Sequence, residues 1–250
     1  INLVLDALDK PKLDIETSFY TSLTRLRDMI ENIVVVPGLR ELPQRYLKRG
    51  LSETFVGEKA ENLGDILKHG NNIKKVNYWF NKFEIPYSID VKEVGNFYEI
   101  IMKSKNKDKK SLNLSYRDVG LGYSLSLPLI VTCLTNSNSI ILVEEPELHL
   151  HPKLQASLMD LFLFSSIENK NQFIVETHSE NLLLRAQKSI RRGYKYKNNI
   201  LKINKNLISV NNIYVDEGAS MSQKINLSDT GEFKTHWKDG FFADRLDELF

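Results

Sequence analysis

Two adjacent glutamates and a histidine stand where they could act on a phosphate group. Glu144 and Glu145 directly follow the apolar run IILV (140–143), and His178 closely follows the run FIV (173–175). Ligands bind at the carboxyl ends of strands in open α/β sheets. There one carboxylate can hold Mg²⁺ through its water shell, while the next orients or deprotonates an attacking water. A histidine on the same edge can hydrogen-bond a phosphate oxygen or that water, so the three residues predict nucleotide hydrolysis.

A glycine-containing turn upstream offers a second phosphate-binding element. Gly120, Gly122 and Ser124 lie in YRDVGLGYS (116–124), next to an apolar segment that is predicted to be a helix. Glycines permit close approach of the backbone to a ligand, and the amino terminus of a helix attracts anions. Each element has a plainer alternative: the acids are solvated, the histidine lies in a loop where Ser179 or Thr177 caps a helix, and the glycines only form a turn. The three elements together favour the functional interpretation.

The elements that position these residues follow an α/β pattern. Apolar strands at 140–143 and 173–175 alternate with helices at 153–165 and 180–192, which is typical of a parallel sheet. We expect both strands to be buried. The other predicted elements are helices at 12–32, 123–135 and in part of 61–85, a strand at 33–36, an ordered loop at 37–58, strands within 91–101, an exposed hairpin tip at 103–110, and short strands LKIN (201–204), LISV (207–210) and IYV (213–215) before an aromatic, acidic tail.

The composition is that of an ordinary globular protein. The 250 residues include 34 basic and 32 acidic side chains, and the net charge of +2 excludes neither nucleic acid nor acidic ligands. No apolar stretch reaches about 18 residues, so we expect no membrane span. No signal-peptide pattern opens the chain. The single cysteine, Cys133, lies in an apolar run and is predicted to be a buried, reduced thiol, which favours the cytoplasm.

Three motifs resemble those of known ATPases. DVGLGYSLSLP (118–128), EEPELHLHP (144–152) and ETHSE (176–180) are similar to the motifs VGxGxSQxLP, EEPExHLHP and ETHSE of bacterial AAA-type ATPases with a C-terminal domain of unknown function. More broadly, they resemble the C-terminal half of ABC-type ATPase heads of the SMC/RecF/OLD group. The segments VPGLRELPQRY, VGEKAENL and WKDGFF also resemble parts of that family, so the likeness covers most of the chain.

The resemblance implies a role for each candidate residue. Glu144 takes the magnesium position of the Walker B motif, and Glu145 takes the position of the catalytic base. His178 is the switch histidine. Leu150 and His151 occupy the D-loop, which crosses to a partner subunit, and His151 is expected to help bind the nucleotide.

The resemblance also implies ligands, a fold and an assembly. Gly120, Gly122 and Ser124 form the signature loop, which contacts the γ-phosphate of ATP held by a second protomer; Leu125 replaces the glutamine of the family there. The expected ligands are ATP and Mg²⁺, and the expected assembly is a homodimer or higher oligomer through the ATP sites. The implied fold is α/β: an ABC-ATPase-like, mostly parallel sheet flanked by helices, with a small C-terminal β-rich extension.

One element that the resemblance requires is missing from the sequence. No GxxxxGK[ST] motif occurs in the 250 residues, and the nearest candidate, GLSETFVGEK (50–59), has the wrong spacing. That motif supplies an amide cradle, a lysine for the phosphates and a hydroxyl for Mg²⁺. Since the chain opens at Ile1 in apolar sequence, we expect either a fragment without its amino-terminal lobe or a natural half that works with another chain. We expect this segment alone not to hydrolyse ATP.

We expect three parts along the chain. Residues 1–110 form a lobe before the signature loop, 111–197 form half of the ATPase core, and 198–250 form the extension. Residues 185–205 hold eight basic side chains and no acid, with tyrosines interleaved. This block either follows the phosphate backbone of DNA or is a solvated face that partly complements a helix dipole.

The resemblance implies an ATP-driven dimerising switch that controls a nuclease or another effector protein in bacterial antiphage defence. The alternative is a non-catalytic scaffold or a nucleic-acid-binding module that retains the head fold. An intrinsic Toprim nuclease is not expected, because Asp216 and Glu217 are followed by no DxD pair. His149 and His151 belong to the EEPELHLHP motif, and no Cys/His spacing typical of a metal site occurs.

Overall fold

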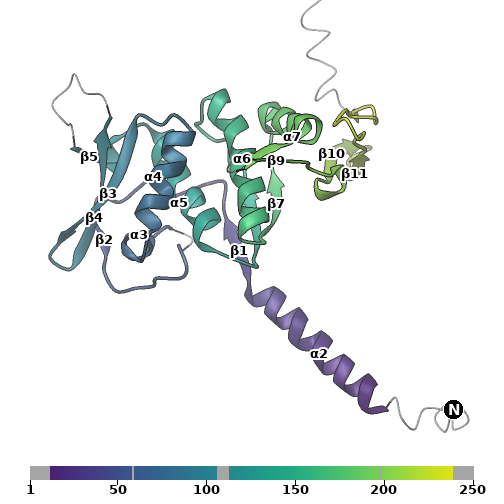
Figure 1. Cartoon of the computed structure of the whole chain (residues 1–250), viewed down its shortest axis with the longest axis horizontal. Helices are drawn as coiled ribbons and strands as arrows, with labels where there is room; N and C mark the ends of the chain where they lie inside the picture. Colours follow the sequence, from purple (N-terminus) through teal and green to yellow (C-terminus); the bar gives the residue numbers. More distant parts are fainter. Residues whose placement is uncertain (1–11, 58, 106–112, 197–198, 239–250) are drawn as a thin grey trace, which may run out of the picture.

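The computed structural model describes residues 12–57, 59–105, 113–196 and 199–238 (Figure 1). The helices are α2 (Lys12–Glu31), α3 (Leu63–Lys68), α4 (Asn72–Lys82), α5 (Leu121–Thr135), α6 (Pro152–Glu168) and α7 (Glu180–Arg192), with 3₁₀ turns η2 (Tyr116–Asp118) and η3 (Lys205–Leu207). The strands are β1 (Ile33–Val36), β2 (Leu47–Lys48), β3 (Tyr87–Val94), β4 (Phe97–Ser104), β5 (Asn113–Ser115), β6 (Ile140–Glu144), β7 (Gln172–Glu176), β8 (Tyr194–Tyr196), β9 (Asn199–Leu201), β10 (Val210–Asp216) and β11 (Ala219–Ile225).

A parallel sheet of strand order β1-β6-β7 carries the candidate site. Val36 pairs with Val143, which pairs with Val175, so the three strands end at the same edge. Short β-branched runs favour these strands, and α6 makes the crossover between β6 and β7 that parallel pairing requires. The expected mixed α/β fold, with a parallel sheet flanked by helices, is confirmed.

The two faces of this sheet differ in burial. Val36, Ile141 and Val143 are buried on one face. On the other face Val35 is 43% exposed and Ile174 is 64% exposed. The prediction of a second buried strand is therefore wrong, because β7 lies at the sheet edge and its opposite face is uncovered in the described part of the chain. An apolar run in the sequence predicts a strand that is buried on both faces, but it does not show whether other elements cover both faces.

Helix α5 links the parallel sheet to the rest of the core. The helix is apolar on all sides, as expected for a helix buried in a core, and Leu127, Leu129 and Ile130 are fully buried. It contacts α4 on one side and α6 on the other. Cys133 is buried within it as a free thiol, as predicted.

An antiparallel sheet of order β2-β4-β3, with β5 beside β4, forms the other side of the fold (Figure 1). Helices α3 and α4 pack against it, with Trp79 and Phe80 of α4 fully buried. Ile100 and Met102 of β4 join the same apolar cluster, which extends from Val36 to Ile203. The strand and helix predictions here are confirmed. The predicted hairpin tip begins in β4, which runs to Ser104, and residues 106–112 lie outside the described part.

The C-terminal part consists of two small antiparallel pairs, β8-β9 and β10-β11. The IYV strand is confirmed within β10, whereas the predicted strands at 201–204 and 207–210 are largely wrong. The side chain of Asn204 accepts a hydrogen bond from the Asn206 amide at 2.9 Å, which caps η3 in place of a strand. The predicted aromatic, acidic tail, FFADRLDELF (241–250), lies outside the described residues.

Helix α2 extends away from the rest of the fold (Figure 1), and its predicted position is confirmed. Phe19, Leu23 and Leu26 on it are each about half exposed, at 59%, 46% and 53%. Among the residues that the structure describes, no helix is both long and apolar enough to span a membrane.

Candidate functional site

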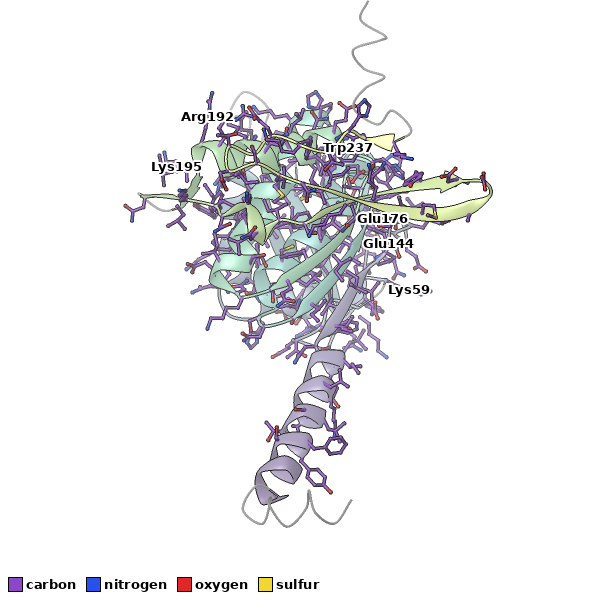
Figure 2. The ribbon with its side chains drawn as sticks, turned by 90° about the vertical axis from the view of Figure 1, so that its right-hand side faces the viewer. Lys59, Glu144, Glu176, Arg192, Lys195 and Trp237 are labelled. Carbon is purple, nitrogen blue, oxygen red and sulfur yellow. The ribbon has the colours of Figure 1, made fainter. Side chains whose placement is uncertain are left out.

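Glu144 ends β6 at the carboxyl edge of the parallel sheet. One of its carboxylate oxygens, Oε2, accepts a hydrogen bond from the Gly38 amide at 3.0 Å. Its neighbour on β7 is Glu176, so two exposed carboxylates lie side by side at this edge (Figure 2). Gly38 is the second residue of the loop after β1, and a Cβ built on it would lie 3.4 Å from the Glu144 Cβ. The loop after β1 therefore packs directly against Glu144.

Glu145 and His178 lie next to each other, as the sequence predicts. Glu145 Oε1 is 4.0 Å from His178 Nε2, and the side chains are 36% and 76% exposed. Glu145 has a φ of +39°, so the chain turns sharply after β6, and its amide donates to the Glu176 carbonyl at 2.9 Å. A left-handed conformation at a residue other than Gly, Asn or Asp is uncommon and costs about 1 kcal/mol or more. This turn directs the side chain toward the loop after β7.

The loop after β7 also caps the next helix. The side chain of Ser179 accepts a hydrogen bond from the Leu182 amide at 3.3 Å, which caps α7. The Thr177 hydroxyl in turn accepts from the Ser179 amide at 3.0 Å. The capping alternative is thus correct for Ser179, and it is compatible with an exposed His178 between the two residues.

Glu147 and Gln155 make hydrogen bonds at the site that the sequence did not predict. Glu147 is 9% exposed, and its Oε1 accepts from the His178 amide at 2.6 Å. The Gln155 side chain accepts from the Ser179 hydroxyl at 2.8 Å and donates to the Leu150 carbonyl at 3.0 Å. Both side chains tie the loop after β7 to the segment after β6. In the sequence, only its place within EEPELHLHP indicates that Glu147 belongs to the site. Nothing in the sequence indicates this for Gln155.

Arg40 also contacts the site, and the sequence did not predict this. Its Nη2 donates to the Glu144 carbonyl at 3.1 Å and lies 3.5 Å from the Glu145 carbonyl. Burial lowers the pKa of the Arg40 guanidinium, and the carboxylates of Glu147 and Glu145 oppose that shift. The cation therefore supports the backbone of both glutamates from the loop after β1. An arginine in a proline-containing loop gives no hint of this contact in the sequence.

The two glycines of the turn differ in their surroundings: Gly122 is packed against backbone, whereas Gly120 has free space around it. A Cβ on Gly122 would lie 2.4 Å from the His149 carbonyl oxygen, so this glycine permits close approach of backbone rather than only of a ligand. Gly120 is the N-cap of α5, without a side-chain cap hydrogen bond, and the nearest atom that a Cβ on it would meet is Tyr123 Cδ2 at 3.9 Å. Ser124 is buried, and its hydroxyl donates to the Gly120 carbonyl at 3.3 Å.

The expected D-loop residues occupy different environments. His151 is exposed and is the N-cap of α6, where its Nδ1 accepts from the Lys153 amide at 3.3 Å. Leu150 is buried. His149 has a φ of +60° and presents its carbonyl to Gly122. The segment is therefore a tight connection between β6 and α6 that packs on the glycine turn.

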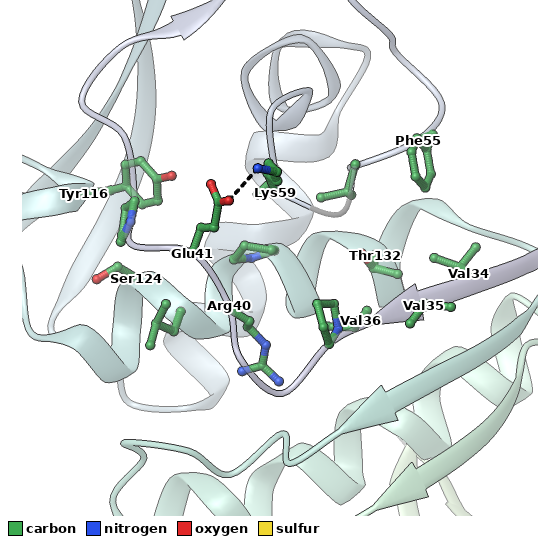
Figure 3. A pocket seen from close by; sticks show the side chains of 17 residues that line it. Val34, Val35, Val36, Arg40, Glu41, Phe55, Lys59, Tyr116, Ser124 and Thr132 are labelled. Atoms are coloured by element: carbon green, nitrogen blue, oxygen red, sulfur yellow. Dashed lines mark ion pairs between the residues drawn. The ribbon is translucent and has the colours of Figure 1, made fainter.

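A small cavity lies behind the sheet edge, between the loop after β1 and α5 (Figure 3). Its volume is about 30 Å³, enough for a water molecule and far below the several hundred Å³ of a ligand pocket. Glu41 and Lys59 form an ion pair of 2.7 Å at its wall, and Arg40 and Ser124 also line it. This cavity is therefore too small for a nucleotide.

Tyr116 lines this cavity, and we expect the ionisation of its buried phenol to make the stability of the fold depend on pH. Burial raises its pKa from 10.0 to about 12, and a hydrogen bond with the Gln44 backbone opposes the shift. Above pH 10 the unfolded chain loses this proton before the folded protein does, so the free energy of unfolding falls, by about 2 kcal/mol in total near pH 12. Urea unfolding at several pH values should show a shallower alkaline loss for Tyr116→Phe than for the wild type.

Tyr78 provides the matched control for this prediction. Its side chain is 61% exposed, so Tyr78→Phe removes a phenol without removing a buried one. If Tyr116→Phe and Tyr78→Phe lose stability with pH along the same curve, burial of Tyr116 does not cause the dependence.

The basic block at 185–205 is partly engaged within the fold. Arg185 pairs with Asp160 at 2.8 Å, Arg191 donates to the Thr230 carbonyl at 3.2 Å, and Lys205 pairs with Asp229 at 3.1 Å. The Tyr194 ring is buried, and burial raises the pKa of its phenol. Tyr194, one of the tyrosines interleaved in the basic block, therefore packs inside the fold and is not exposed to a nucleic acid. Arg192 and Lys195 are exposed (Figure 2).

The donor set at the sheet edge suits Mg²⁺ that keeps most of its water. Glu144 offers an exposed carboxylate at a strand end, and its Oε1 makes no hydrogen bond with the residues described here. Within the described ranges, no group of three or more His, Cys, Asp or Glu could enclose a metal ion. Mg²⁺ is commonly held by one or two carboxylates together with waters and substrate phosphates, so Glu144 fits that mode.

A mixed α/β fold with helices flanking a parallel sheet is shared by proteins of many functions, so the fold alone does not assign one. The family comparison does: the family described as "AAA domain, putative AbiEii toxin, Type IV TA system" matches residues 37–185. The match covers more than half of the chain, and the chain belongs to this family of AAA-type ATPase domains.

Solved structures of SMC proteins are among the similar folds. One comes from work on ATP-driven dimerization and DNA-stimulated activation of SMC ATPases; it is 14% identical, has a TM-score of 0.45, and the match covers 62% of this chain and 83% of that one. An Smc head bound to the C-terminal winged-helix domain of ScpA is 15% identical with a TM-score of 0.48, covering 70% of this chain and 48% of that one. The Smc head with an extended coiled coil, bound to the C-terminal domain of ScpA from Pyrococcus furiosus, is 14% identical with a TM-score of 0.43, covering 62% and 34%. Curated protein sequences gave no match.

Proposed function

We propose that this chain is the part of an ATPase head that carries the Walker B, D-loop and switch elements. The observation that carries the proposal is the 4.0 Å approach of Glu145 Oε1 to His178 Nε2 at the carboxyl edge of a parallel sheet, beside Glu144. The phosphate-binding loop would come from outside these 250 residues, in the same polypeptide or in another. The proposed parts of the chain are 1–110, 111–197 and 198–250, as the sequence suggests.

The proposed roles come from the family resemblance, and the positions of the side chains support them. Glu145 accepts a proton from the attacking water or orients it, and His178 donates a hydrogen bond to that water or to a phosphate oxygen. Glu144 would hold Mg²⁺ through water, and the ion would neutralise charge on the phosphates. The open carboxyl edge leaves room for the nucleotide in front of these groups.

The proposal includes an ATP-dependent dimer. The amino terminus of α5 at Gly120 is exposed and has no side-chain cap, so its amides are suited to a phosphate held by a second protomer. Gly122 and Ser124 shape that terminus, and His151 lies exposed at the D-loop. Control of a nuclease or other effector and a role in antiphage defence are parts of the proposal that rest on the family resemblance alone. The proposed cytoplasmic location rests on the single cysteine, Cys133, which is buried as a free thiol.

The experiment is an ATP hydrolysis assay on the natural protein with its phosphate-binding loop, together with its mass in solution with and without ATP and Mg²⁺. We expect hydrolysis and ATP-dependent dimerisation. A protein that possesses the loop yet neither hydrolyses ATP nor dimerises with it would instead be the scaffold considered as the alternative.

A second candidate function is DNA binding through Arg192 and Lys195, which are exposed beside the C-terminal end of α7 (Figure 2). The double variant Arg192→Glu/Lys195→Glu should weaken binding to duplex DNA and reduce the slope of log affinity against log salt by about 2, since each phosphate contact contributes about 0.9. Lys74→Glu/Lys75→Glu on α4 is the control with an equal change of charge. Equal effects of the two double variants would indicate only a general charge effect.

A further inference from the structure

The His178 ring has little to fix its position by itself. Its side chain is 76% exposed, and the 4.0 Å to Glu145 Oε1 exceeds the length of a hydrogen bond. An exposed ion pair of this length contributes little orientation, because solvent screens the attraction. The location of the ring is therefore set mainly by the main chain of the loop that carries it.

Glu147 holds that main chain. Its Oε1 accepts from the His178 amide at 2.6 Å, the geometry of a charge-assisted hydrogen bond. Glu147 itself belongs to the tight turn that follows Glu145, in which the Leu148 amide donates to the Glu145 carbonyl at 3.2 Å and the Leu150 amide donates to the Glu147 carbonyl at 3.0 Å. One rigid turn thus carries Glu145 and also holds the loop of His178.

The second carboxylate oxygen of Glu147 shows that the contact with His178 lowers the stability of the fold. Glu147 is 9% exposed, and its Oε2 is buried without a hydrogen-bond partner among the described residues. The neighbouring opposite charge is the Arg40 guanidinium, whose Nε is likewise buried and unpartnered within the described chain. A buried carboxylate with only one hydrogen-bonded oxygen lowers the stability of the fold. Proteins retain such a group at functional sites, where the geometry that it provides matters more than the lost stability.

We propose that Glu147 is a positioning residue for His178. By accepting a hydrogen bond from the His178 amide, Glu147 sets the separation of the imidazole from Glu145, and the attacking water would be oriented between these two groups. The catalytic consequence rests on the proposed function, whereas the contact itself does not. Glu147 touches no reacting atom and acts through His178.

The test is hydrogen exchange of histidine amides in the whole chain, labelled with ¹⁵N only at its five histidines. Glu147→Ala removes the acceptor, and we expect the His178 amide to exchange about 10-fold to 100-fold faster, with the other histidine amides unchanged. Glu147→Gln retains an acceptor oxygen without the charge, so it should give an intermediate acceleration. Glu176→Ala, which removes an exposed carboxylate two residues before His178, should leave the rate unchanged.

Two results would overturn the proposal. One is an unchanged His178 exchange rate in both Glu147 variants. The other is an equal acceleration of all described histidine amides, which would mean that Glu147 supports the fold in general. Should Glu147→Ala fail to fold, the comparison of Glu147→Gln with the wild type decides between these results and the expected one.

Turnover of the natural protein provides the second readout. If Glu147 acts through His178, Glu147→Ala lowers turnover by about as much as His178→Ala, and the double variant is no slower than His178→Ala. Additive losses would contradict the positioning role. A failed exchange test leaves the ATPase proposal intact, whereas absence of ATP hydrolysis in the wild type leaves the Glu147 contact intact, so the two failures are distinguishable.

Discussion

Glu145→Gln should lower ATP turnover of the natural protein by about 10²-fold to 10⁴-fold, the range that a general base contributes. The side-chain amide keeps the size of the carboxylate but cannot accept a proton from water. ATP binding should persist, because Glu144 and the glycine turn are unchanged. ATP-dependent dimers should therefore accumulate instead of dissociating, which light scattering after gel filtration in ATP and Mg²⁺ measures directly.

Glu176→Gln is the control for this prediction. Glu176 lies at the same edge, pairs with Glu144 across β6 and β7, and undergoes the same change of charge. Its turnover should stay within a few-fold of the wild type. Turnover in Glu145→Gln that equals that of Glu176→Gln would remove Glu145 from the role of base and leave only a general electrostatic contribution of the edge.

Gly122→Ala should disrupt the packing of α5 on the segment between β6 and α6. The added Cβ would lie 2.4 Å from the His149 carbonyl oxygen, and backbone must retreat to restore an ordinary contact. Overpacking of this kind costs about 1–3 kcal/mol, and alanine in a helix recovers up to about 1 kcal/mol relative to glycine. We expect a net loss of about 1–2 kcal/mol in the free energy of unfolding, measured by urea denaturation. Turnover should fall by about 10²-fold, since a displacement near 1 Å can misalign the reacting groups.

Gly120→Ala is the matched variant for stability. Its φ is −56°, and the nearest heavy atom that its Cβ would meet is 3.9 Å away, which is ordinary contact. Its only expected cost is the poorer N-cap, about 0.5–1 kcal/mol. Equal unfolding free energies for the two variants would show that the segment between β6 and α6 moves to accommodate the added methyl group without strain.

The acids, the histidine and the strands that carry them could be predicted from the sequence because these signals are local. An apolar β-branched run followed by Glu144 and Glu145 specifies a strand and its end, and parallel strands joined by a helix must end at one edge. The meeting of Glu145 with His178 follows from that topology. The capping role of Ser179 was equally readable, since it depends on residues within one turn.

Contacts between distant segments were decided only by the tertiary structure. Arg40 reaches the Glu144 carbonyl, and Glu147 reaches the His178 amide, across 104 and 31 positions of sequence, respectively. Gly122 is required by the carbonyl of His149, not by its own turn. Hydrophobic periodicity reports which faces of an element are apolar, but it does not report which neighbour is present to cover them. For that reason Ile174, apolar in sequence, is exposed in the fold, and Tyr194, set among basic residues, is buried.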